Sequence, residues 1–231
     1  MAIKTIPKNK APNSGSTALN AQDFQQYSQQ KTVTLEDILS EFKKLKLPQK
    51  TTNAFTIAYG IAEKVHKTQK RDTGDPYITH PLKVSLNLLR FGFTDSVLLS
   101  AAVLHDVLEE GPRNGYPVKN LESEILNKLK PVLGNKAEVV LENVKRLSNN
   151  YYSYGEGINA EVLPVKLCDI LHNSSSLQEL ISQNPKKVKK GITKYSLFLE
   201  RFKELAFQDP KTKAICDQIF IELEKAKNIS P

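Results

Sequence analysis

The 231-residue sequence has little of what several classes of protein require. Its two cysteines, Cys168 and Cys216, have no CxxC spacing, which argues against a disulfide framework and a structural zinc cluster. No apolar run approaches the ~20 residues needed to cross a bilayer, and residues 1–15 lack the apolar stretch of a secretory signal. We therefore expect a cytoplasmic protein without a membrane anchor.

The sequence also lacks the patterns of nucleotide-binding sheets. No segment shows the alternation typical of a strand, and neither GxGxxG nor GxxxxGK[ST] occurs. A Rossmann or P-loop enzyme is therefore not expected. The apolar residues recur with helical spacing instead, which predicts an all-α helical bundle.

The net charge of +8 is unevenly distributed. Residues 1–32 hold four lysines against one aspartate, and residues 182–231 hold eleven basic against six acidic residues, so the segment between them is neutral. The basic run 186–190 is the one candidate for a nucleic-acid contact, and we interpret it as the solvated start of a helix after Pro185. We expect no nucleic-acid partner, although a basic surround can still steer a polyanionic small molecule.

The distribution of proline, glycine and polar residues predicts one helical domain after a tail. Residues 1–32 are rich in Asn, Gln, Ser and Lys with few apolar anchors, so we expect a disordered basic tail there and a single domain over 33–231. Thr34 is a suitable N-cap for the first helix. The sequence does not indicate an oligomeric state. Helices are expected over 35–45, 50–69, from Pro81, over 95–109, 119–130 and 136–147, around Asp169, and over 186–207 and 211–227.

Four residues have the chemistry of a divalent-metal site: His80, His105, Asp106 and Asp169. Two neutral imidazoles and two carboxylates neutralise one divalent cation, and this mixed nitrogen and oxygen set suits manganese, iron or zinc better than calcium. Because neighbouring residues on a helix point about 100° apart, His105 and Asp106 can share only an ion that lies against their helix. We therefore expect the metal at a seam between helices.

Three blocks, at residues 70–81, 101–110 and 165–173, resemble the signatures of the HD-domain alarmone hydrolases of the Rel/SpoT type. With no synthetase domain after them, the chain is most similar to the small stand-alone members. The resemblance implies removal of the 3′-pyrophosphate from the guanosine alarmones ppGpp and pppGpp with a manganese ion. It also implies roles for particular residues: His80, His105, Asp106 and Asp169 as metal ligands, Glu109 and Glu110 in proton transfer, and Arg71, Tyr77, Lys166 and Asn173 in substrate binding.

Two departures from the family pattern leave alternatives open. Glu109-Glu110 stands where the family usually has Glu-Asp, and Asp72-Thr73 where it usually has a basic residue. An HD phosphatase acting on another nucleotide, such as ppApp or NADPH, is therefore the second hypothesis. A non-catalytic nucleotide-binding module is the third, and the intact ligand set argues against it. We interpret His172 as a residue behind the ligands or in helix packing, and we assign no role to His66.

Overall fold

The computed structural model describes residues 32–149, 151, 153 and 155–229, and the tail predicted for 1–32 lies outside them except for Thr32. Every regular element in these ranges is a helix, and one isolated antiparallel bridge joins Lys70 to Pro76. The all-α prediction is confirmed. The helices are α2 (Leu35–Lys44), α3 (Gln49–His66), α4 (Thr79–Arg90), α5 (Ser96–Leu104), α6 (Val107–Glu110), η1 (Pro112–Asn114), α7 (Val118–Leu133), α8 (Lys136–Leu147), α9 (Leu163–Ser175), α10 (Leu177–Leu180), α11 (Pro185–Ala206) and α12 (Pro210–Ile229).

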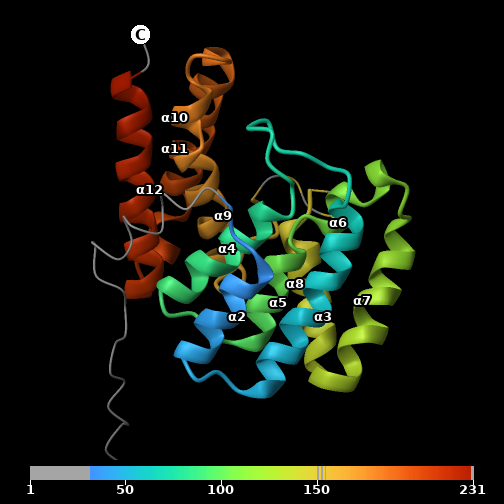
Figure 1. Ribbon diagram of the computed structural model, residues 1–231. Coiled ribbons are helices and arrows are strands. Elements are labelled where there is room, and N and C mark those ends of the chain that lie inside the picture. The colour runs from blue at the N-terminus through green and yellow to red at the C-terminus, as the bar shows by residue number, and fades with distance from the viewer. Residues whose placement is uncertain (1–31, 150, 152, 154, 230–231) are drawn as a thin grey trace, which may run out of the picture.

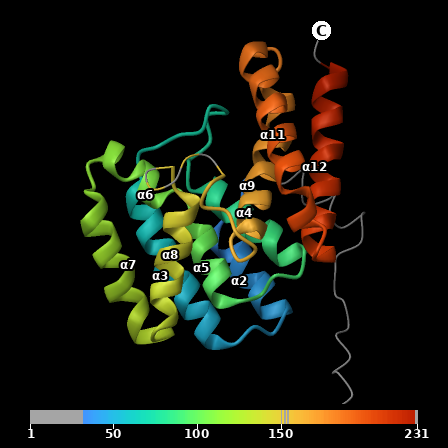
Figure 2. The ribbon, with the colours of Figure 1, turned by 180° about the vertical axis from the view of Figure 1, so that it is seen from behind.

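The helices form two packed groups. Helix α5 packs against α3 and α8, and α7 packs against α3 and α8 on the outside of this first group. In the second group α9 packs against α4 and α12, with α11 beside α12. Figures 1 and 2 show α11 and α12 side by side at one edge of the molecule and α7 at the opposite edge. The groups meet where α5 contacts α4 and α9, so three helices converge on one seam.

Local sequence sets where helices α2 and α11 begin. The Thr34 hydroxyl accepts a hydrogen bond from the Asp37 amide at 3.3 Å, and the Asp37 carboxylate accepts one from the Thr34 amide at 2.8 Å. This capping box satisfies two amides at the start of α2. Helix α11 begins at Pro185, whose fixed φ and missing N–H suit a first helical position. The predicted start at Thr34 and the predicted helix after Pro185 are thus both present.

The prediction of a single helix over 95–109 is wrong, because the helix is interrupted at His105 and Asp106, between α5 and α6. The Ala102 carbonyl, which would accept from the Asp106 amide in a continuous helix, instead accepts from His105, from its ring Nδ1 at 2.8 Å and its amide at 3.5 Å. Asp106 then adopts φ −95° and ψ −8°. Helix α5, which is the part of this segment before the interruption, is nevertheless apolar on nearly all sides, and seven of its nine residues are buried.

Glycine is required at the end of α6. A Cβ at Gly111 would lie 2.3 Å from a methyl of Leu121 on α7 and 2.6 Å from the Val107 carbonyl. Helix α6 can therefore approach α7 only with a glycine at this position.

In the described part of the chain, no helix is both long and apolar enough to cross a membrane.

Candidate metal centre

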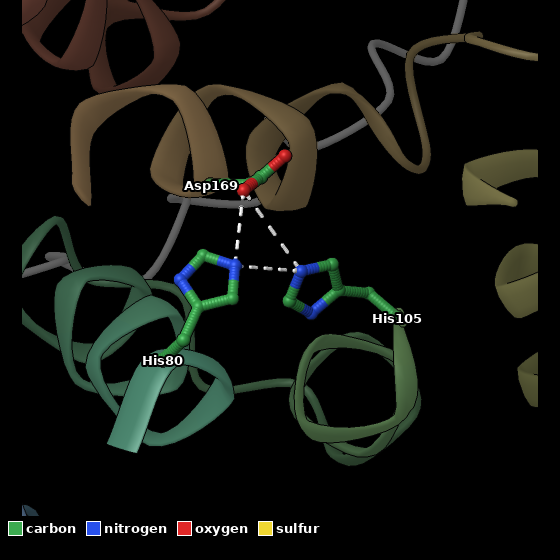
Figure 3. A group of neighbouring side chains, drawn as sticks. All are labelled: His80, His105 and Asp169. Atoms are coloured by element: carbon green, nitrogen blue, oxygen red, sulfur yellow. Dashed lines mark hydrogen bonds and ion pairs between the residues drawn. The ribbon is translucent and has the colours of Figure 1, made fainter. Parts of the chain in front are cut away.

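Two histidines and one aspartate converge at the seam of α4, α5 and α9. Figure 3 shows Asp169 from α9 facing His80 and His105 across this seam. His80 Nε2 lies 3.2 Å from His105 Nε2 and 3.2 Å from Asp169 Oδ1, and His105 Nε2 lies 3.9 Å from the same oxygen. All three side chains are buried, and their ligand atoms lie within 4.8 Å of one another.

Asp106 brings a second carboxylate to the same place. Its Oδ2 lies 3.2 Å from His105 Nε2 and 3.5 Å from His80 Nε2. The Tyr77 hydroxyl donates a hydrogen bond of 2.7 Å to this oxygen and fixes the carboxylate. All four residues predicted as ligands therefore face one point.

Each ligand is positioned by a different local structure. His80 lies in the first turn of α4, and its amide donates to the Tyr77 carbonyl at 2.9 Å. His105 and Asp106 occupy the break between α5 and α6, which turns both side chains toward the seam. Asp169 lies within α9, where the Lys166 ammonium and the Asn173 amide donate to its two oxygens at 2.8 and 2.6 Å.

The protonation states follow from burial and mutual charge. Burial, aided by the Arg71 charge, lowers the pKa of His80 to about 4. Burial raises the pKa of Asp169, but the Lys166 ammonium and the imidazoles outweigh it and hold that pKa well below its usual range. Burial also lowers the pKa of His105, yet the Asp106 carboxylate overcomes it and the pKa is raised. At neutral pH the seam thus offers a neutral His80 and an ionised Asp169, as metal ligation requires.

The donor set fits a divalent cation. His105 Nδ1 contacts the Ala102 carbonyl, which can only accept, so when the ring is neutral this nitrogen carries the proton and Nε2 is bare to bind a cation. Nε2 of His105 lies beside Asp106 and Asp169, so acceptors converge at short distance in a buried site. Such an array is satisfied by a cation or by a proton. Two nitrogen and two carboxylate donors suit a divalent transition metal.

The two acidic residues predicted for proton transfer have different partners. Glu109 Oε2 accepts hydrogen bonds from Asn149, from its side-chain amide at 2.9 Å and its backbone amide at 3.2 Å. Glu110 accepts from the Gln69 amide at 2.8 Å and forms an ion pair with Arg113. The charge of Glu110 is therefore already paired, whereas the hydrogen bonds to Glu109 from Asn149 come from neutral amides.

The residues predicted to bind substrate fall into two sets. Arg71 donates to Asn173 Oδ1 at 2.7 Å, and its guanidinium lies over the Tyr77 ring at 5.7 Å from the centroid. These three side chains form one polar cluster beside the ligands. Lys166, by contrast, contacts Asp169 directly, so its charge acts first on a ligand carboxylate.

Two further histidines lie next to this cluster, and the sequence suggested a place behind the ligands or in helix packing for His172 but no role for His66. His172 Nδ1 lies 2.6 Å from His80 Nδ1, as a residue behind the ligand would. His66, to which the sequence suggested no role, is buried and stacks on the Tyr77 ring at 4.7 Å. Gln69 contacts both His66 and Glu110, at 2.8 Å each. The motif block at 70–81 begins directly after Gln69, and this position next to the block was the signal in the sequence that could have indicated a role for Gln69.

A basic groove lies along α11. It has a volume of about 470 Å³ and is lined by four lysines together with apolar and aromatic side chains. One of its lining residues, Lys194, is close enough to Lys166, Asp169 and Glu109 to experience their charges. Burial, together with the nearby Lys166 charge, lowers the pKa of Lys194. The lining residues are Leu177, Lys186, Lys187, Lys190, Gly191, Lys194 and Tyr195.

The middle of the chain matches a known family model. Residues 58–152 match the family model described as HD domain. This range includes His80, His105 and Asp106, whereas Asp169 lies beyond it. Residues 58–152 are therefore similar to an HD domain, and the regular elements of the described residues are all helices.

Several curated proteins that are similar to this chain have names that describe enzymes of ppGpp metabolism. A guanosine-3′,5′-bis(diphosphate) 3′-pyrophosphohydrolase of Borreliella burgdorferi is 32% identical over 73% of this chain and 28% of its own length. The bifunctional (p)ppGpp synthase/hydrolase SpoT of Escherichia coli is 31% identical over 63% of this chain and 21% of its length. A GTP pyrophosphokinase of Streptomyces coelicolor is 31% identical over 62% and 17%. The chain is thus related to Rel/SpoT-type proteins and spans less than a third of the length of these relatives.

Proposed function

We propose that the chain is a manganese-dependent phosphohydrolase that removes the 3′-pyrophosphate from ppGpp and pppGpp, giving GDP or GTP. The observation that supports this most directly is the convergence of two imidazoles and two carboxylates at the seam of α4, α5 and α9. The relatives that are named as 3′-pyrophosphohydrolases support the choice of substrate. The basic groove on α11 supplies positive charge for a ligand with several phosphates.

His80, His105, Asp106 and Asp169 would hold the cation. A divalent cation bound there supplies Lewis-acid polarisation of a phosphoryl oxygen and lowers the pKa of water. Tyr77 holds Asp106 and Lys166 holds Asp169, so both carboxylates are oriented before substrate arrives.

Hydrolysis also needs a group that moves a proton. A water oxygen bonds to the phosphorus next to the 3′ oxygen, the bond between that phosphorus and the 3′ oxygen breaks, and the 3′ oxygen gains a proton. We assign acceptance of the water proton to Glu109, whose carboxylate is held by Asn149 alone among the described residues. Glu110 would have a supporting role because it is paired with Arg113.

The polar cluster beside the ligands would bind the nucleoside. The flat guanidinium of Arg71 can stack on a purine as it now lies over Tyr77. Asn173 joins Arg71 to Asp169 and links this cluster to the metal centre. The groove beyond it, at about 470 Å³, lies within the size range of small-molecule sites.

The test is pyrophosphate release from ppGpp with added manganese. Wild type should release pyrophosphate, and Asp106→Ala and Glu109→Ala should each lose about 10²-fold or more in kcat. Glu138→Ala, which removes an exposed carboxylate on α8, is the control and should retain full activity. Assays of ppApp and NADPH run in parallel. Turnover of ppApp or NADPH without turnover of ppGpp would refute the guanosine assignment. If no nucleotide is turned over while ppGpp still binds, the proposal that the chain is an enzyme is refuted.

A further inference from the structure

His172 lies directly behind a ligand of the metal centre. Its Nδ1 is 2.6 Å from Nδ1 of His80, and the two rings stack at 4.9 Å between centroids with an angle of 26°. Both side chains are buried, and 92 residues separate them in sequence. Because an imidazole nitrogen either donates or accepts, this contact requires one protonated and one bare nitrogen.

The opposite side of His80 decides which nitrogen is protonated when a cation is bound. His80 Nε2 faces the centre, with His105 Nε2 and Asp169 Oδ1 both at 3.2 Å. A ligating nitrogen must be bare, so a neutral His80 that binds through Nε2 keeps its proton on Nδ1. That proton then points at His172 Nδ1, which must be the bare acceptor.

The other ring nitrogen of His172 must then carry the proton of that ring. His172 lines a small polar pocket of about 30 Å³ together with Asp75, Ser176 and Glu179. A space of this size is large enough for one water molecule, and the lining offers carboxylate and hydroxyl acceptors.

We propose that His172 is the positioning residue that sets the tautomer of His80, by accepting the Nδ1 proton of His80 and leaving Nε2 bare for the cation. The inference rests on the metal centre of the proposed function and does not depend on the nucleotide. The two histidine ligands obtain their tautomers from different sources. His105 uses the main-chain carbonyl of Ala102, so substitution of His172 changes His80 and leaves His105 unaffected.

Two substitutions separate this role from packing. In His172→Asn the Oδ1 branches from Cγ as Nδ1 does in histidine, so an acceptor remains at the same reach. In His172→Leu a methyl takes that place and no acceptor remains. Zinc affinity of the full chain, measured by calorimetric titration at pH 8, should fall about 10- to 100-fold in the Leu variant. The Asn variant should stay within about threefold of wild type. Circular dichroism should show both variants folded.

Nitrogen-15 NMR reads the tautomers directly. The chain has four histidines, so long-range proton–nitrogen spectra of the zinc-loaded protein can be assigned by single substitutions. We expect His80 and His105 with protonated Nδ1 and His172 with protonated Nε2. A protonated Nδ1 on His172 would overturn the proposal, as would equal zinc affinities of the Asn and Leu variants. Failure of the wild-type chain to bind zinc would instead overturn the metal centre and this role together.

Discussion

Tyr77 is the residue that fixes Asp106. Its hydroxyl donates to the Asp106 carboxylate at 2.7 Å, and its ring is held by His66. Tyr77→Phe should keep the ring stacked and remove the donor, so we expect manganese affinity to fall about tenfold, within the range for groups behind a ligand. Calorimetric titration measures it. Tyr59→Phe removes a hydroxyl bonded to Glu63 at 2.6 Å, away from the ligands, and should leave affinity unchanged. Equal affinities of the two variants would contradict the assignment.

Glu109 and Glu110 are adjacent, yet their surroundings predict different losses on neutralisation. Glu109→Gln removes the carboxylate that we assign to the water proton, so kcat should fall about 10²- to 10⁴-fold. Glu110→Gln removes a carboxylate already paired with Arg113, and the loss should be less than about tenfold. Steady-state kinetics on ppGpp distinguishes them. A larger loss in the Glu110 variant would reverse the roles.

The face of α11 that lines the groove is the element to test for phosphate binding. Lys190 lines the groove, whereas Lys189 is exposed on the same helix and is not among the lining residues. Lys190→Gln should raise KM for ppGpp about three- to tenfold with little change in kcat, because it removes a rim charge that acts on bound substrate. Lys189→Gln carries the same change in net charge and should leave KM as it is. The difference should shrink in high salt, and equal KM values would show that only net charge matters.

Element boundaries were predictable where local chemistry sets them. Thr34 starts α2 through a capping box with Asp37, three residues away, and Pro185 starts α11 through its fixed φ. Both features depend on residues close together in the sequence, so they can be predicted from it. The break at His105 was not predicted, because the segment is uniformly apolar before it. A side-chain contact to the Ala102 carbonyl ends the helix there, and apolar periodicity carries no sign of such a contact.

The ligands and their supports differ in the same way. The four predicted ligands lie in the three motif blocks, so the sequence alone could assign them to one site. The contact of His172 with His80 depends on how α9 packs against α4, and Gln69 reaches Glu110 across 41 residues. Such long-range partners are set by tertiary packing, which no local pattern specifies.

At the scale of the whole molecule, the buried histidines make stability depend on pH. His80 has a pKa of about 4 in the folded chain, against an ordinary value near 6.5. Between these values the unfolded chain binds a proton that the folded chain does not. The stability that this difference contributes is therefore complete above pH ~6.5 and is lost progressively as pH falls from there to about 4. The raised pKa of His105 acts in the opposite sense and offsets part of the loss.

Guanidinium unfolding of the metal-free protein measures this dependence. From pH 7.5 to 5, we expect His80 to remove about 2 kcal/mol from the free energy of unfolding. His80→Asn lacks the titrating ring, so its stability should fall by about that much less over the same interval. The comparison cancels the contributions of titrating groups whose pKa does not depend on His80, provided that both proteins unfold in one cooperative step. Parallel pH profiles for the two proteins would mean that His80 titrates alike in the folded and unfolded chains, and that the seam does not hold it neutral for a metal.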